Sequence, residues 1–153
     1  MDLSQLSKFL LDSNKAGYAS EKSNSQQEPD GSTTITFVSS DFKSHDNFFG
    51  GEPYGGRVVV FYKEKPIWMM VYYGAVDDSI KNFGGVYGFL KKALMAMPEN
   101  DPYRGPKLLE EGPYKYENSW RGNLESYSGE EKIYLNGSQI YWAKYIGGLV
   151  DQR

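Results

Sequence analysis

The polar side chains that could do chemistry are few and widely spaced in this chain. The single histidine, His45, stands beside Asp46, and a histidine next to a carboxylate can act as a general base. No nucleophile-elbow motif accompanies this pair. We therefore interpret His45 as a residue of a turn or a strand edge, and we predict no catalytic residue.

Glu52 and Glu125 occupy equivalent places in two similar segments of the chain. Paired carboxylates perform acid–base chemistry in glycosidases, where their separation sets the outcome. The alternative is that each glutamate accepts hydrogen bonds from its neighbouring glycine-rich turn. A carboxylate-based enzyme, such as a hydrolase or isomerase, is thus a third hypothesis, and the sequence leaves open whether the chain is an enzyme.

The motif Tyr103-Arg104-Gly105-Pro106 carries the most informative polar residue. The guanidinium group is a planar fork that suits a carboxylate or a phosphate. The alternative role for Arg104 is to tie its loop to a carboxylate or a carbonyl of the protein itself. The predicted ligand site combines arginines for an anionic group with rings on which a flat group could stack: Arg57, Trp68, Tyr72, Tyr103, Arg104, Trp120, Arg121 and Tyr145.

The composition narrows the classes of cofactor and partner. The chain has 153 residues, a formal net charge of −3 and no cysteine, so neither thiolate chemistry nor a cysteine-ligated metal is available. One histidine and scattered carboxylates give no metal-ligand spacing, and we predict neither metal nor cofactor. Without a basic field, binding to duplex nucleic acid is disfavoured. With no secretion signal or long apolar run, we predict a cytoplasmic protein without a membrane partner.

An ungapped self-comparison aligns residues 52–76 with residues 125–149. The matched positions include Tyr72 with Tyr145 and Gly56 with Gly129. Chance resemblance between two β-hairpins is the alternative explanation. We predict an α+β fold made of two tandem helix-plus-antiparallel-sheet units related by internal duplication, with the helices packed on the sheet. These units, residues 1–76 and 77–153, would form one domain over residues 1–153.

A two-residue hairpin turn is predicted at Asn136-Gly137, because both residues tolerate positive φ. The turn implies that Leu135 faces Ser138, Tyr134 faces Gln139 and Ile133 faces Ile140. The core face of this hairpin would then carry Ile133, Leu135, Ile140, Trp142 and Ile146. The opposite face, with Tyr134, Tyr141 and Tyr145, would be half exposed or a binding platform.

The other hairpin, residues 57–73, is apolar on both faces, which predicts that both of its faces are covered. A helix is expected over residues 3–14, capped by Asp2. A second helix follows Gly84-Gly85, with Val86, Phe89, Leu90, Leu94 and Met97 at helical spacing, and Pro98 ends it.

Four short motifs carry a family resemblance: Pro66-Ile67-Trp68-Met69-Met70-Val71-Tyr72-Tyr73-Gly74, Val86-Tyr87-Gly88-Phe89-Leu90, Pro102-Tyr103-Arg104-Gly105-Pro106 and Tyr145-Ile146-Gly147-Gly148. In order and spacing they resemble an uncharacterised bacterial domain-of-unknown-function family, whose members are sometimes fused behind a helix-turn-helix DNA-binding domain. The resemblance covers nearly the whole chain. It implies one domain, and through the fusion it implies the sensing half of a regulator.

The leading hypothesis is therefore a non-enzymatic small-molecule-binding domain, either a sensor or a sequestering protein, with an aromatic-lined pocket for an anionic or flat ligand. The second is a protein–protein interaction module, such as an inhibitor of a bacterial or phage defence system, which would use an aromatic-rich surface. A homodimer is possible with either hypothesis.

Overall fold

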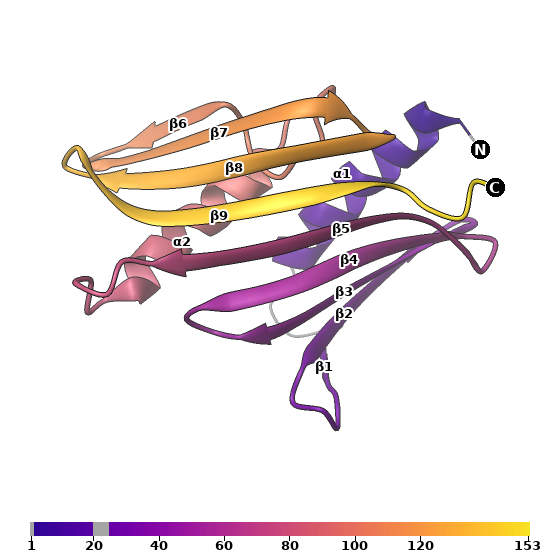
Figure 1. Cartoon of the computed structure of the whole chain (residues 1–153), viewed down its shortest axis with the longest axis horizontal. Coiled ribbons are helices and arrows are strands. Elements are labelled where there is room, and N and C mark those ends of the chain that lie inside the picture. The colour runs from indigo at the N-terminus through magenta and orange to yellow at the C-terminus, as the bar shows by residue number, and fades with distance from the viewer. Residues whose placement is uncertain (1, 20–24) are drawn as a thin grey trace.

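The computed structural model describes residues 2–19 and 25–153, which form one antiparallel sheet with two helices (Figure 1). The elements in chain order are α1 (Leu3–Ala19), β1 (Ser25–Gln27), β2 (Thr33–Ser39), β3 (Phe42–Gly50), β4 (Tyr54–Tyr62), β5 (Lys65–Val76), α2 (Phe83–Met95), β6 (Leu108–Glu111), β7 (Tyr114–Asn123), β8 (Ser126–Leu135) and β9 (Ser138–Leu149).

The described strands form a single sheet in the order β1-β2-β3-β4-β5-β9-β8-β7-β6. Two meanders, β1 to β5 and β6 to β9, meet where β5 and β9 pair antiparallel over nine residue pairs, from Trp68 opposite Leu149 to Val76 opposite Tyr141. In this central ladder Tyr72 lies directly opposite Tyr145. The last strand of each meander therefore lies in the interior of the sheet.

The prediction of two tandem helix-plus-sheet units is wrong, because the described residues form one continuous nine-stranded sheet and the fold is mostly β. The two aligned segments, residues 52–76 and 125–149, are hairpins of this one sheet. The physical reason is edge pairing: β5 and β9 would each present unpaired backbone groups at a free edge, and their pairing satisfies both edges.

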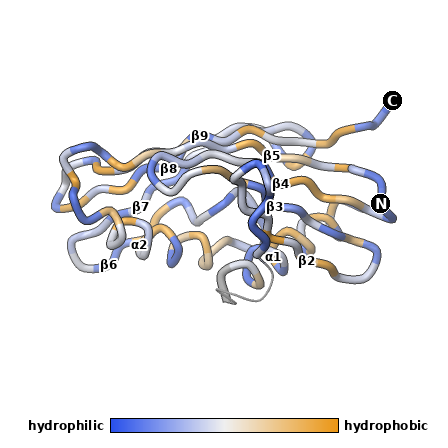
Figure 2. The backbone as a smooth tube through the Cα atoms, turned by 90° about the horizontal axis from the view of Figure 1, so that it is seen from below, coloured by the Kyte–Doolittle hydropathy of each residue, from blue (hydrophilic) through white to orange (hydrophobic). Residues whose placement is uncertain are grey.

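Both helices lie on the same face of the sheet (Figure 2). The predicted second helix is confirmed as α2, although it begins at Phe83, before Gly84-Gly85, and ends at Met95, before Met97. It buries Val86, Phe89, Leu90 and Leu94 against β7, β8 and β9. The first helix runs beyond its predicted end, to Ala19. It packs Leu6, Phe9 and Leu10 over the β2–β5 half of the sheet. The helices also contact each other, since Asn14 Nδ2 donates a hydrogen bond to the Leu94 carbonyl at 2.6 Å.

The Asn136-Gly137 turn is confirmed, with φ of 49° and 82°. Leu135 pairs with Ser138 and Tyr134 with Gln139, as predicted. The register then shifts between Ile133 and Tyr134, so that Ile133 pairs with Tyr141 instead of Ile140. Such a bulge places an extra residue in one strand of a pair.

The bulge makes the predicted core face of β9 wrong beyond Ile140. Tyr141, Ala143 and Tyr145 are buried under the helices, whereas Ile146 is 63% exposed on the opposite face. Side chains alternate with a period of two, so one extra residue transfers every later side chain of the strand to the other face. Tyr141 and Tyr145, which were predicted to be half exposed or to form a binding platform, are therefore part of the core, whereas Tyr134 is half exposed.

The prediction that both faces of the first hairpin are covered is also wrong. Trp68 and Met70 of β5 are buried under the helices, but Val71 and Tyr73, on the other face, are 45% and 50% exposed. This second face, which we call the open face, carries no helix of the described chain (Figure 2). No helix in the described residues is long and apolar enough to cross a membrane.

Gly129 of β8 is required by the ring that lies opposite it. A Cβ atom at this position would lie 2.2 Å from both Cζ and Oη of Tyr145, its partner across the strands. Because the Tyr145 ring is buried, Gly129→Ala should overpack the core and lower the free energy of unfolding by about 1–3 kcal/mol. Ser128→Ala, on the open face, is the control. Urea denaturation would measure both, and equal midpoints would contradict the packing argument.

Candidate functional site

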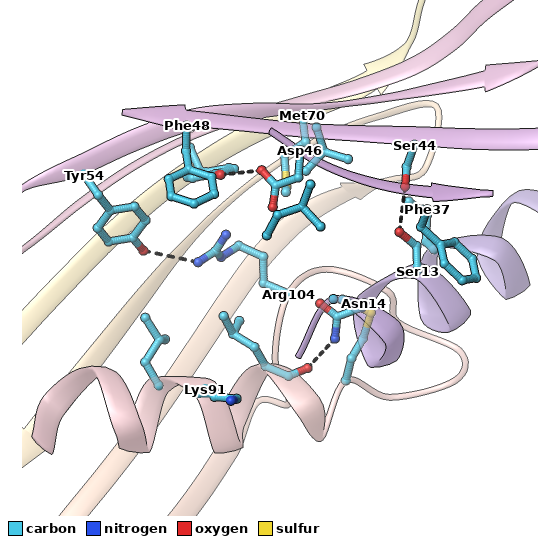
Figure 3. A pocket seen from close by; sticks show the side chains of 18 of the residues that line it. Ser13, Asn14, Phe37, Ser44, Asp46, Phe48, Tyr54, Met70, Lys91 and Arg104 are labelled. Atoms are coloured by element: carbon cyan, nitrogen blue, oxygen red, sulfur yellow. Dashed lines mark hydrogen bonds between the residues drawn. The ribbon is translucent and has the colours of Figure 1, made fainter. Parts of the chain in front are cut away.

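A cavity of about 370 Å³ lies between the sheet, the two helices and the loop that follows α2 (Figure 3). The sheet contributes side chains of β2 to β5, and each helix contributes residues from one of its faces. The lining residues are Leu10, Ser13, Asn14, Gly17, Ile35, Phe37, Ser44, Asp46, Phe48, Gly50, Gly51, Tyr54, Val58, Trp68, Met70, Tyr72, Tyr87, Leu90, Lys91, Leu94, Met97, Pro102 and Arg104. Most of these are apolar or aromatic, so the cavity suits a molecule with a largely apolar body.

Alternation along the strands explains why apolar walls and polar groups share the cavity. In β5, Trp68, Met70 and Tyr72 all point to the helix side. In β3 the same phase brings Ser44, Asp46 and Phe48 to that side. A strand delivers every second residue to one face whatever its polarity. Asp46 therefore reaches an interior that the other strands make hydrophobic.

Arg104 lies at the end of the cavity nearest β9, in a left-handed backbone conformation with φ of 72°. Its side chain is only 8% exposed, and its Nε donates a hydrogen bond to Glu131 Oε1 at 2.5 Å. One terminal nitrogen donates to the Tyr54 hydroxyl at 3.3 Å. The guanidinium lies over the ring of Tyr72, at 5.1 Å from its centroid. The sequence left two roles open for Arg104, ligand binding and attachment of its loop to a protein carboxylate. The structure is compatible with both, because Arg104 is paired with Glu131 and also lines the cavity.

Glu131 is fully buried, and its two carboxylate oxygens accept hydrogen bonds from Arg104 and from the Tyr116 hydroxyl. Tyr116 donates its hydroxyl proton to Glu131 Oε2 at 2.5 Å. The oxygens of Tyr54 and Tyr141 lie 2.5 Å apart, which extends the network from Arg104 across the sheet. Burial, and then the charge of Glu131, raises the pKa of Tyr116 and of Tyr141 well above the ordinary value. These hydroxyls therefore stay protonated and remain donors.

Asp46 is the carboxyl group that faces the cavity directly. Tyr72 donates its hydroxyl proton to Asp46 Oδ1 at 2.5 Å. The side chain is surrounded by protein atoms, although part of it remains accessible from the cavity. Burial raises the pKa of Asp46, while the Tyr72 hydrogen bond and the Arg104 charge act in the opposite direction. An uncompensated carboxylate in such surroundings costs folding free energy.

The structure separates the eight predicted ligand residues into three groups. Trp68, Tyr72 and Arg104 line the cavity, and Tyr145 lies buried beside them with the Arg104 guanidinium 6.0 Å from its ring centroid. Tyr103 is buried away from the cavity, where its ring packs 5.2 Å from that of Trp120. The third group consists of Arg57 and Arg121.

Arg57 and Arg121 are exposed side chains of the open face. Each is one residue out of phase with a position that faces the helices. Arg57 follows Gly56, which pairs with Tyr72, and Arg121 follows Trp120, which pairs with Gly129. Neither arginine can join Arg104 around one ligand in the cavity, because the sheet lies between them. Arg57 instead borders a hollow on the open face that is also lined by His45.

The candidate acid–base residues do not come together. Glu52 accepts hydrogen bonds from the Tyr87 hydroxyl and the Val76 amide, which is the local role weighed as its alternative. Glu125 lies near the opposite end of the hairpins, where its amide is held by Asn123. His45 is on the open face, and burial together with Lys43 and Arg57 lowers its pKa. No group of three or more His, Asp or Glu side chains in the described residues could hold a metal ion.

Sequence reasoning missed Asp46, Glu131 and Tyr54 as members of the site. A signal exists for Asp46 and Glu131, because each is a charged residue in phase with buried neighbours of its strand. Asp46 follows Phe42 and Ser44, and Glu131 precedes Ile133. Charged residues at such positions are rarely buried unless they are paired or functional.

The chain belongs to the family described as "Domain of unknown function (DUF5680)", whose profile matches residues 46–150. The match begins at Asp46 and includes Arg104 and Glu131, so these three charged groups lie within the family domain. Comparison with curated proteins gives no match, and comparison with solved structures gives none.

Because Glu131 is paired with the buried Arg104, we predict that its substitution lowers stability much more than the same substitution of the adjacent Glu130. Glu131→Gln leaves the Arg104 charge buried without its carboxylate, and the free energy of unfolding should fall by about 3–5 kcal/mol. Glu130→Gln is the matched control, because Glu130 is half exposed on the open face, 3.9 Å from Lys132 Nζ, and should change stability by less than about 0.5 kcal/mol. Chemical denaturation would measure both, and similar losses would refute the assignment of the ion pair.

Proposed function

We propose that this protein is a small-molecule-binding domain whose ligand occupies the cavity between the sheet and the two helices. The observation that carries this proposal is the cavity itself: about 370 Å³ walled mostly by apolar and aromatic side chains, with Asp46 and Arg104 among its few charged groups. Ligand sites commonly combine an apolar wall with a few positioned polar groups. A role as a sensor or as a sequestering protein is consistent with such a site.

The shape of the cavity wall supports a ligand with a flat apolar part. Trp68, Tyr72, Tyr54 and Phe48 contribute ring surface on the sheet side. Tyr54 is held by hydrogen bonds at its hydroxyl, and the Tyr72 hydroxyl is bound to Asp46. Because these rings are fixed before a ligand arrives, little side-chain entropy is lost on binding.

The expectation of an anionic ligand group receives less support than that of a flat one. The Arg104 charge is already paired with Glu131 Oε1 at 2.5 Å, so the guanidinium gives the cavity little net positive charge. Arg57 and Arg121, which were expected to assist it, are exposed on the open face. The proposed site therefore keeps Arg104 as a wall and hydrogen-bond donor, with the half-buried rings of Phe48 and Tyr54 as stacking surfaces and the buried Trp68 and Tyr72 as part of the wall.

A second candidate function, binding of a protein partner, is favoured by the open face. Val71 and Ile146 are direct neighbours across β5 and β9, and they are 45% and 63% exposed. Next to them the rings of Tyr73 and Trp142 pack with their centroids 5.8 Å apart. A contiguous exposed apolar patch of this kind is typical of interaction surfaces. With either function we propose a cytoplasmic location.

The cavity proposal predicts different effects for one substitution at two adjacent positions. Val58→Phe places a larger side chain into the cavity, whereas Val59→Phe places it on the open face. The first should abolish binding of a flat probe, tryptophol, and should also remove any small molecule that co-purifies with the wild-type protein from the producing cells. The second should leave both unchanged. Isothermal titration calorimetry and native mass spectrometry would measure these effects.

Unchanged tryptophol binding in Val58→Phe would show that the probe binds elsewhere and would count against the cavity. The second candidate has its own test, Ile146→Lys, which should leave cavity binding intact and weaken any self-association seen by analytical ultracentrifugation. Circular dichroism would verify that each variant is folded.

A further inference from the structure

We infer that the ligand of the cavity carries a basic group, such as a protonated amine, which binds the Asp46 carboxylate while the rest of the molecule lies against the aromatic wall. This inference rests on the proposed function and specifies the chemical class of its ligand. It makes Asp46 the residue that determines specificity.

The geometry around Asp46 provides one filled and one open position for a hydrogen-bond donor. Oδ1 accepts the Tyr72 hydroxyl proton at 2.5 Å, and the described residues supply no hydrogen bond to Oδ2. Figure 3 shows the carboxyl group directed into the space between the sheet and the helices. A ligand that fills this space must satisfy that oxygen, because a buried acceptor left without a donor costs about 1–3 kcal/mol.

The surrounding charges favour a cation at this point. Arg104 approaches Asp46 from the loop after α2, but its Nε is committed to Glu131, so the three groups together carry one net negative charge when Asp46 is ionised. Lys91 of α2 also lines the cavity, and Figure 3 places it on the far side from Asp46. Glu52 lies beyond Tyr87, which binds it. An anionic ligand group at Asp46 would be repelled, whereas a cationic one would neutralise the site.

The aromatic wall adds to this preference. Rings attract cations over their faces, and the attraction increases when water is excluded. The Tyr72 ring already lies under one cation, the Arg104 guanidinium, at 5.1 Å. Phe48 provides further ring surface near the carboxyl group, and Tyr54 extends the aromatic wall toward Arg104. A carboxylate surrounded by rings is the combination that recognises an ammonium group attached to an apolar body.

Burial of the ionised Asp46 side chain also lowers the stability of the ligand-free protein. Its pKa is raised by burial. Between the ordinary pKa of an aspartate and this raised value, the folded state binds more protons than the unfolded state, so stability falls as pH rises through that window. Asparagine would keep an acceptor for Tyr72 without the charge. Asp46→Asn should therefore melt at a higher temperature than the wild type at neutral pH, with a smaller difference at pH 4.

Three matched indole probes separate the charge preference from cavity binding itself. Tryptamine is a cation, tryptophol is neutral and indole-3-acetate is an anion, and all share the same flat body. In the wild-type protein at pH 7.5, isothermal titration calorimetry should rank their affinities tryptamine, then tryptophol, then indole-3-acetate. Asp46→Asn should weaken tryptamine binding by at least about tenfold and change tryptophol binding by less than about threefold. Asp41→Asn, an exposed aspartate near Lys63, is the control and should change neither.

The pH dependence provides an independent readout. Tryptamine stays protonated over the pH range used, so its affinity should increase as pH rises through the pKa of Asp46 in the free protein. Tryptophol affinity should be nearly independent of pH. In Asp46→Asn the increase for tryptamine should disappear.

Each outcome has a distinct meaning. If no probe binds the wild-type protein and no small molecule co-purifies with it, the proposed function fails and the inference fails with it. If tryptophol or indole-3-acetate binds as well as tryptamine, or if Asp46→Asn keeps the tryptamine preference, the cavity function stands and the inference is refuted. A higher melting temperature of Asp46→Asn would show that lost tryptamine binding does not result from unfolding.

Discussion

The buried ion pair between Arg104 and Glu131 is the interaction on which the rest of the structure depends. It joins the loop after α2 to β8, and Tyr116 and Tyr54 connect it to β7 and β4. Removing one member of such a pair leaves an uncompensated charge in the interior, which costs about 3–5 kcal/mol. The pair therefore fixes the loop against both halves of the sheet, and with it one end of the cavity.

The one-sided covering of the sheet explains both candidate functional surfaces. The two helices lie on the same face, each over one half of the sheet. They contact each other where Asn14 reaches Leu94, but they leave a space above β3 and β5 that becomes the cavity. The other face has no helix over it, so apolar residues such as Val71 and Ile146 are left at the surface.

The contrast between Glu131 and Asp46 shows how one fold can treat two interior carboxyl groups differently. Glu131 receives a guanidinium and a tyrosine hydroxyl, and so its charge is compensated within the protein. Asp46 receives one hydroxyl, from Tyr72, and otherwise faces the cavity. Proteins retain destabilising groups mainly where function requires them. This difference, more than the size of the cavity, identifies Asp46 as the polar centre of the proposed site.

The sequence by itself determined the local features of this protein. It gave the α2 helix, through apolar residues at helical spacing, and the Asn136-Gly137 turn, because positive φ at two successive residues restricts the choice of amino acids. It also indicated Arg104 as a residue of interest. The helix and turn predictions succeeded because each depends on residues that are neighbours in the chain.

Only the tertiary structure decided which residues share a face and which charges are paired. The bulge at Ile133 and Tyr134 reversed the faces of β9, so that Tyr145 is in the core and Ile146 is at the surface. Pairing of β5 with β9 merged two expected units into one sheet. The phase of β4 and β7 placed Arg57 and Arg121 on the open face, away from Arg104. A strand's pattern repeats every two residues, so a shift of one residue reverses its faces without changing its composition. The partner of a buried charge, as with Arg104 and Glu131, is likewise set by packing between distant segments.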